Sequence, residues 1–293
     1  MSRTPMTLID SDRCTGCGRC VSVCPDDTLS IVDGKCRVTG EQSMHCGQCV
    51  AVCPEGAVSL PGIAPVVLKG QNVSAETAQL LALMQRRRSC RRYGKQPVLR
   101  TVLEDLVRIG VTAPSGTNSQ KWTFTVIPDR DGMVFFGERV ADFYRKVNRQ
   151  AESAGMRLLA RLFMKDALGA YYRRHYESVK SALADWDAGG RDRLFHGAAA
   201  GIIVSVKKGA SCPGEDALLA AGNILLGAET CGLGTCLIGF AVEAMKRDGS
   251  IAEAIGIPPD ETVYAVVALG HPAIRYQRPA GRREPLVRFF KES

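Results

Sequence analysis

Cysteines at short, regular spacings mark the N-terminal part of the chain as a metal-binding region. Eight of the twelve cysteines lie between residues 14 and 53. The first run, residues 14–25, has the pattern C-x2-C-x2-C-x3-C-P, and the second, residues 46–54, has the pattern C-x2-C-x3-C-P. This spacing lets three thiolates of one loop bind one iron–sulfur cluster while the fourth binds a neighbouring cluster. Zinc sites do not need cysteine triplets that end in Cys-Pro, and disulfide frameworks are typical of secreted chains, so the pattern indicates iron–sulfur chemistry.

The two runs belong to an internal repeat with an offset of about 29 residues, which suggests duplication of one unit. One position departs from the repeat, because Cys14 of the first copy corresponds to Ser43 of the second. Cys36, seven residues before Ser43, restores the eight cysteines that two four-iron clusters need. A thiolate is the softer ligand for iron, which favours Cys36; the alternatives are Ser43 or a second cluster that lacks a fourth protein ligand.

The cysteine pattern resembles that of two-cluster ferredoxins. The resemblance implies two [4Fe-4S] clusters whose ligands cross between the runs. The first cluster would be bound by Cys14, Cys17, Cys20 and Cys53, and the second by Cys24, Cys46, Cys49 and either Cys36 or Ser43.

A second group of candidate residues is rich in arginine. Residues 86–93 have the sequence RRRSCRRY and follow a predicted helix whose N-cap is Ser74. Taken alone, such a run could be a solvated charged surface. A turn that carries guanidinium groups and a hydroxyl also suits a phosphate, because guanidinium forks bind phosphate oxygens in pairs.

A further motif, APSGTNSQKW at residues 113–122, lies between a predicted helix at residues 100–110 and a predicted strand at residues 123–127. The combination of R-R-S-x-R-x-Y with A-P-S-x-x-N-x-Q-x-W resembles the flavin-dependent nitroreductase family. Residues 215–239, 264–272 and 278–285 resemble that family's long core helix with its glycine-rich turn, its last core strand and its arginine-bearing tail. Together with the cysteine-rich region, the chain resembles ferredoxin–nitroreductase fusions.

This resemblance implies an FMN site and assigns no catalytic side chain, because the reaction takes place at the flavin N5. The implied FMN-binding residues are Arg87, Arg88, Ser89, Arg91 and Arg282 at the phosphate and ribityl end, Pro114, Ser115, Gly116, Asn118 and Gln120 at the ring and its polar edge, and Leu237, Ile238 and Gly239 beneath the ring. His175 and His196 are interpreted as structural residues.

The resemblance also predicts the organisation of the chain. Residues 1–61 would form the two-cluster ferredoxin-like module, with a βαβ-βαβ order, and residues 62–73 a breaker-rich linker. Residues 74–293 would form an α+β nitroreductase domain, with a mixed sheet wrapped by helices and FMN sites at a homodimer interface. Residues 138–195 would be a helical insertion, used either for packing and dimer contact or as a wall over the flavin.

Composition restricts the partners. The chain has no secretory signal and no apolar run long enough to span a bilayer, which predicts a cytoplasmic protein without a membrane partner. The net charge of +8 is spread along the chain without a nucleic-acid motif, so an anionic cofactor or an acidic redox partner explains it better than nucleic acid.

Three functions are compatible with these features. In the first, an FMN-dependent oxidoreductase receives electrons from an external low-potential donor through the clusters and reduces an electron-poor nitroaromatic, quinone or activated alkene. In the second, NAD(P)H reduces the flavin directly and the clusters are a secondary relay. In the third, the chain is an electron-transfer or redox-sensing module without a substrate of its own.

Overall fold

The computed structural model describes residues 7–40, 43–63, 76–163 and 167–290. The chain divides into two compact units: residues 1–74 together with 115–120, and residues 75–114 together with 121–293. Ser74 and most of the predicted linker at residues 62–73 lie outside the described residues. Among the described residues, no helix combines the length and the apolar character needed to cross a membrane.

The N-terminal unit consists of short elements that follow the internal repeat. They are β1 (Leu8–Ile9), α1 (Arg19–Ser22), β2 (Leu29–Val32), β3 (Lys35–Val38), α2 (Gln48–Val52) and β4 (Val58–Ser59). Strands β1 and β4 pair antiparallel, and β2 and β3 form an antiparallel hairpin. Each helix has one buried residue, Cys20 in α1 and Cys49 in α2, so the core of this unit is built around cysteine side chains.

The larger unit is built on a four-stranded sheet with the order β5-β6-β8-β7. Its strands are β5 (Trp122–Ile127), β6 (Ala200–Lys207), β7 (Gly234–Leu237) and β8 (Glu261–Gly270). Its helices are α3 (Thr77–Arg86), α4 (Arg100–Gly110), α5 (Arg130–Glu152), α6 (Ala154–Phe163), α7 (Ala167–Arg174), α8 (Tyr176–Asp187), α9 (Pro213–Thr230), α10 (Gly239–Arg247) and α11 (Gly249–Glu253).

These elements agree with the expected α+β architecture and correct one detail of it. The predicted helix at residues 100–110 is confirmed, and the predicted strand at residues 123–127 begins one residue earlier. The four strands pair antiparallel throughout, whereas a mixed sheet was expected. Within the described residues, the parallel component is an isolated bridge between Ser89 and Thr235.

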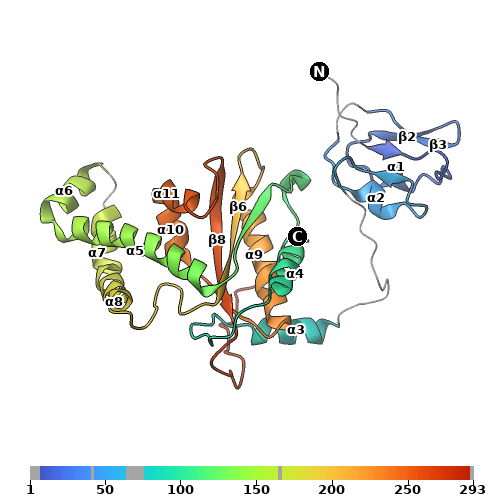
Figure 1. The fold of residues 1–293 in the computed structure, drawn as a ribbon. Helices are drawn as coiled ribbons and strands as arrows, with labels where there is room; N and C mark the ends of the chain where they lie inside the picture. Colours follow the sequence, from blue (N-terminus) through green and yellow to red (C-terminus); the bar gives the residue numbers. More distant parts are fainter. Residues whose placement is uncertain (1–6, 41–42, 64–75, 164–166, 291–293) are drawn as a thin grey trace. The chain divides into compact units, whose positions relative to one another are not determined.

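Alternating side chains of the central strands are buried on both faces of the sheet. On β6, Ile203 packs against one helical layer, and Ile202 and Val204 pack against the other. Figure 1 shows α4 and α9 on one side of β6 and β8, and α5, α10 and α11 on the other. Because both faces are covered, these strands are nearly continuous apolar runs in the sequence.

Two neighbouring phenylalanines of α5 allow a matched test of this core. Phe136 is fully buried, and its ring centroid lies 5.0 Å from that of Phe195, whereas Phe135 is 46% exposed. Phe136→Ala should lower the free energy of unfolding of the larger unit by about 3–5 kcal/mol, because it leaves a cavity. Phe135→Ala should cost less than about 1 kcal/mol, mostly from losing the guanidinium of Arg139 over its ring.

Denaturant unfolding followed by tryptophan fluorescence measures this difference. Both tryptophans of the chain, Trp122 and Trp186, lie in the larger unit, so the signal reports on that unit alone. Equal losses in the two variants would contradict the described orientation of α5.

Candidate functional site

The arginine-rich segment is attached to the sheet at strand β7. The backbone N–H of Cys90 donates to the carbonyl of Thr235 at 2.8 Å, next to the parallel bridge between Ser89 and Thr235. Tyr93 is fixed to the neighbouring strand, since its hydroxyl donates to the carbonyl of Ala268 at 3.1 Å. The segment therefore runs beside β7 in an extended conformation, with successive side chains on opposite sides.

This alternation separates the predicted phosphate-binding residues. Arg91 lines a cavity of about 930 Å³, together with Leu237, Ile238 and Gly239. Arg88 and Cys90 line a second cavity of about 320 Å³. The structure therefore brings Arg91 together with the three residues expected beneath the flavin ring, and it places Arg88 elsewhere.

The other predicted phosphate-binding residues line neither of these cavities. Arg87 nevertheless lies close enough to act electrostatically on Cys236, a residue of the large cavity. Burial raises the pKa of the Cys236 thiol, and the charges of Arg91 and Arg87 oppose that rise. Arg282 lies in the exposed C-terminal segment.

The helical insertion supplies one wall of the large cavity. Phe143 and Tyr144 of α5, Leu159 of α6 and Tyr171 of α7 face it, and α10 contributes Phe240. Tyr144 donates from its hydroxyl to the carbonyl of Phe240 at 2.9 Å, which ties α5 to α10. Tyr171 donates to Asn148 Oδ1 at 2.7 Å, which ties α7 to α5. Burial raises the pKa of both tyrosines, so they are protonated at neutral pH and form a fixed aromatic surface.

His196, interpreted from the sequence as a structural residue, lines this cavity. Its backbone has a left-handed φ of 62°, and its Nδ1 is buried without a hydrogen-bond partner among the described residues. Burial, followed by the charge of Arg91, lowers the pKa of the imidazole, which is therefore neutral at pH 7. A buried polar atom without a partner is a place where a bound group can make a hydrogen bond, so this atom fits a cavity that holds a ligand.

The motif at residues 115–120 forms a compact loop of its own. Gln120 donates from its backbone N–H to Ser115 Oγ at 3.0 Å and from its side chain to Asn118 Oδ1 at 3.1 Å. Ser115, Gly116, Asn118 and Gln120 belong by their contacts to the N-terminal unit, whereas Pro114 belongs to the larger unit. None of these five residues lines either cavity of the larger unit.

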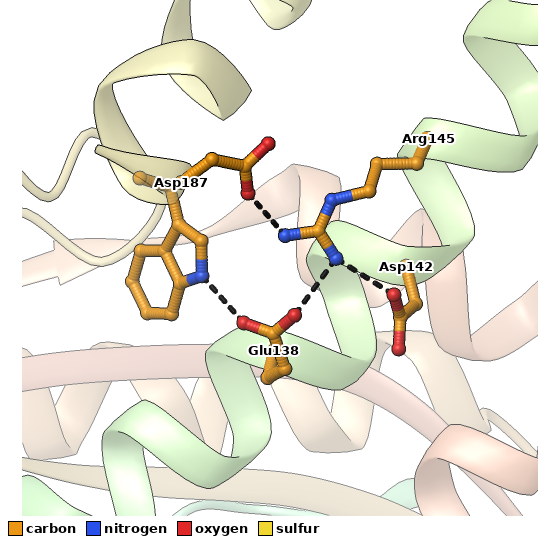
Figure 2. Close-up of polar contacts among 5 residues, drawn as sticks. Glu138, Asp142, Arg145 and Asp187 are labelled. Atoms are coloured by element: carbon orange, nitrogen blue, oxygen red, sulfur yellow. Dashed lines mark hydrogen bonds and ion pairs between the residues drawn. The ribbon is translucent and has the colours of Figure 1, made fainter. Parts of the chain in front are cut away.

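An ion-pair network holds the insertion together (Figure 2). Arg145 of α5 donates to Glu138 and Asp142, each at 2.7 Å, and also to Asp187 at the end of α8. Trp186 donates from its indole N–H to Glu138 at 2.7 Å. The network therefore joins α8 to α5.

The cysteines of the N-terminal unit surround two small cavities. The first is lined by Cys14, Cys17, Cys20, Cys36 and Cys53. The second is lined by Cys24, Cys46 and Cys49, together with Ser43. Cys53 and Cys24 thus cross between the runs as expected, whereas Cys36 lies at the first cavity. The thiols at both cavities are soft donors, which fits iron–sulfur clusters. Within the described ranges, no group of three His, Cys, Asp or Glu side chains is arranged to hold a single metal ion.

Comparison with protein families agrees with this division. Residues 84–271 match the family model "Nitroreductase family". The chain belongs to the nitroreductase family. Residues 7–30 and 34–56 match two models described as "4Fe-4S binding domain". The predicted ferredoxin–nitroreductase fusion is confirmed, and the chain is a flavin-dependent oxidoreductase.

Individual relatives include enzymes named as a dehydrogenase or a reductase and a ferredoxin of Desulfomicrobium norvegicum, which is 50% identical over 28 residues, 10% of this chain and 48% of that protein. An NADH dehydrogenase of Thermus thermophilus is 30% identical over 202 residues, which are 69% of this chain and 88% of that protein. A 4-nitrobenzoate reductase of Nocardioides is 26% identical over 71% of this chain and 87% of that protein. An iodotyrosine deiodinase of Nematostella vectensis is 30% identical over 36% of this chain, and the match spans only 34% of that protein.

Among solved structures, a nitroreductase with bound FMN from Bacteroides fragilis is 19% identical. The match covers 72% of this chain and 99% of that chain, with a TM-score of 0.48.

The network of Figure 2 predicts a pH-dependent contribution to stability. The hydrogen bond from Trp186, followed by that from Arg145, lowers the pKa of Glu138 below its usual 4.5. A lowered folded-state pKa means that the stabilisation is present above about pH 4.5 and is lost as the pH falls through the folded-state value. Glu138→Gln should therefore lower the melting temperature at pH 7, and the difference from the wild type should shrink below pH 4.5.

Thermal unfolding followed by tryptophan fluorescence from pH 3 to pH 8 checks this expectation. Glu104→Gln is a matched control, because Glu104 forms an exposed i,i+4 pair with Arg100, and such pairs contribute about 0.3–0.5 kcal/mol. A Glu138→Gln difference that is independent of pH would contradict the network.

Proposed function

We propose that this chain is an FMN-dependent reductase that receives electrons through two N-terminal [4Fe-4S] clusters and reduces an electron-poor small molecule in the large cavity. The observation that carries the proposal is the composition of that cavity. Arg91 and residues 237–239, which are FMN-binding candidates, border it on one side, and the aromatic residues of the insertion border it on another.

Arg91, which lines the cavity, and Arg87 and Ser89 of the same segment, which do not line it, are the candidates for the phosphate end of FMN. Guanidinium groups of Arg87 and Arg91 and the hydroxyl of Ser89 would bind the phosphate and ribityl end. Gly239 begins α10, where the unpaired N–H groups and the helix dipole favour negative charge, so this end of the cavity suits the ring of an anionic reduced flavin. Bound FMN would supply hydride or single-electron transfer from N5.

The opposite wall favours a flat, electron-poor substrate. Phe143, Tyr144 and Tyr171 offer aromatic surface, and Arg174 of α7 adds positive charge at the same cavity. The cavity, at about 930 Å³, is near the upper end of the usual range for ligand sites, which leaves room for a small molecule beside the cofactor. A nitroaromatic, a quinone or an activated alkene fits this environment, and one relative is named 4-nitrobenzoate reductase.

The fused module supports electron entry through the clusters. A cluster carries one electron at a time, whereas a flavin accepts one or two. Two clusters that feed one flavin would therefore convert single-electron supply into a two-electron reduction. The donor would be an external low-potential protein or small molecule.

Direct reduction by NAD(P)H is a second candidate, and the relative named NADH dehydrogenase favours it. In this case the clusters would be a secondary relay. Nicotinamide would stack on the flavin without a G-x-G-x-x-G motif.

A homodimer would complete the proposed FMN sites, and uncovered apolar residues support it. Helix α3 has no buried residue, and its Leu80, Leu81 and Met84 are 44%, 52% and 45% exposed. Near the C-terminus, Phe289 and Phe290 are 85% and 93% exposed. Light scattering of the purified protein would give twice the chain mass if the proposal is correct.

Arg91→Ala tests the assignment of the cofactor site. Losing a charge-assisted contact to phosphate should weaken FMN binding by about 10–100-fold, since such bonds contribute roughly 1.5–3 kcal/mol. Arg108→Ala is the matched control, because Arg108 lies on α4, is exposed and pairs with Asp105. The measurement is FMN affinity by fluorescence quenching, with melting temperature as a check on folding. Unchanged affinity in Arg91→Ala would contradict the assignment.

Cys17→Ser tests the route of the electrons. Cys17 is an exposed residue of the first cysteine cavity, and its loss should impair the first cluster. Anaerobic stopped-flow should show flavin reduction by a reduced ferredoxin slowed by about tenfold or more, with little change in FMN content. If NADPH reduces the flavin rapidly in both proteins and in preference to the ferredoxin, the second candidate replaces the first.

A further inference from the structure

We propose that the second iron–sulfur site has three cysteine ligands and Ser43 as the fourth, so that one of its irons is exchangeable, while Cys36 is a non-ligating thiol beside the first site. This inference rests on the proposed two-cluster function and distinguishes the two clusters chemically.

The distribution of thiols between the two cavities is the first observation. Five cysteines line the first cavity, one more than a four-iron cluster needs, and three line the second. Cys14, Cys17, Cys20 and Cys53 suffice for the first site. The second site, with Cys24, Cys46 and Cys49, lacks a fourth thiol, and Ser43 lies on its wall.

Cys36 is held at the first cavity by several contacts. Its Sγ lies 3.4 Å from that of Cys20, and its backbone N–H points at Cys14 Sγ at 3.4 Å. The next residue toward the N-terminus, Lys35, donates from Nζ to the carbonyl of Cys14 at 2.6 Å. The hairpin that carries Cys36 is therefore attached to the loop of the first cysteine run.

The geometry of the hairpin prevents Cys36 from turning to the second cavity. Cys36 is paired with Ile31 in the antiparallel register of β2 and β3, and a one-residue shift would move every side chain to the opposite face. The turn of the hairpin packs closely on the cysteine loop, because a Cβ at Gly16 would lie 2.0 Å from the carbonyl oxygen of Gly34. Moving the hairpin would disrupt the first site.

Ser43, by contrast, is held beside the second group of thiols. The backbone N–H of Met44 donates to Asp26 Oδ2 at 2.7 Å, which attaches this loop next to Cys24. The backbone N–H of His45 donates to Ser43 Oγ at 3.1 Å. The same N–H could stabilise a serine oxygen that binds iron, as amides do for cluster ligands.

Ser43 is a weaker ligand than the cysteine it replaces in the repeat. Its oxygen is a harder donor than a thiolate, and the hydroxyl must lose its proton to bind. The iron next to Ser43 should therefore leave first. When a one-electron oxidant such as ferricyanide takes one electron from [4Fe-4S]2+, the products are [3Fe-4S]+ and Fe2+, and the bonds to the three cysteines remain.

Oxidative titration of the anaerobically purified full-length protein tests the assignment. Ferricyanide should produce the EPR signal of an oxidised three-iron cluster in the wild type and release about one iron per chain, with flavin content unchanged. Ser43→Cys should suppress both the signal and the release. Cys36→Ser should behave like the wild type, because Cys36 binds no iron.

The opposite pattern would overturn the assignment. If the wild type keeps two oxidation-resistant four-iron clusters and Cys36→Ser produces the three-iron signal, Cys36 is the ligand and the proposed function is unaffected. If the wild type contains neither iron nor acid-labile sulfide, both the assignment and the proposed electron route fail.

Discussion

The main-chain pairing between the arginine-rich segment and strand β7 determines the arrangement of the candidate flavin site. The hydrogen bond from Cys90 to Thr235 fixes which side chains turn toward the large cavity. The absence of a side chain at Gly234 allows this pairing, because a Cβ at that position would lie only 2.6 Å from Cys90 Cβ. Strand β7 is in turn held by β8, whose side chains are buried in both helical layers. The position of Arg91 therefore depends on the packing of the whole sheet.

Motifs in the sequence predicted the family and the fold class, but of the thirteen candidate FMN-binding residues only Arg91, Leu237, Ile238 and Gly239 line the large cavity. Arg88 and Arg91 belong to one motif, yet they line different cavities because an extended segment alternates its side chains. That separation follows from the pairing with β7, which residue types alone do not specify.

Cys36 shows the same limit in the N-terminal unit. Ligand softness favoured it for the second cluster, whereas the register of a four-residue strand holds it at the first. His196 had no recognisable signal in the sequence, since its left-handed backbone and its unpaired Nδ1 arise only when the surrounding elements pack. Strand register places Cys36, and the packing of neighbouring elements places His196; residue type alone specifies neither position.

The two sides of the large cavity are stabilised by different interactions. The candidate FMN-binding residues of this cavity belong to the arginine-rich segment, β7 and the start of α10, whereas α5, α6 and α7 supply other lining residues. Arg145 binds three carboxylates, two on α5 and one at the end of α8, without involving the central sheet (Figure 2). Under the proposed function, mutations in the insertion would alter which molecules are accepted while the candidate FMN-binding residues keep their positions. Differences in substrate preference among related chains would then be concentrated in α6 and α7. A chimera that exchanges these two helices would change its substrate selectivity and keep the residues of the candidate FMN site.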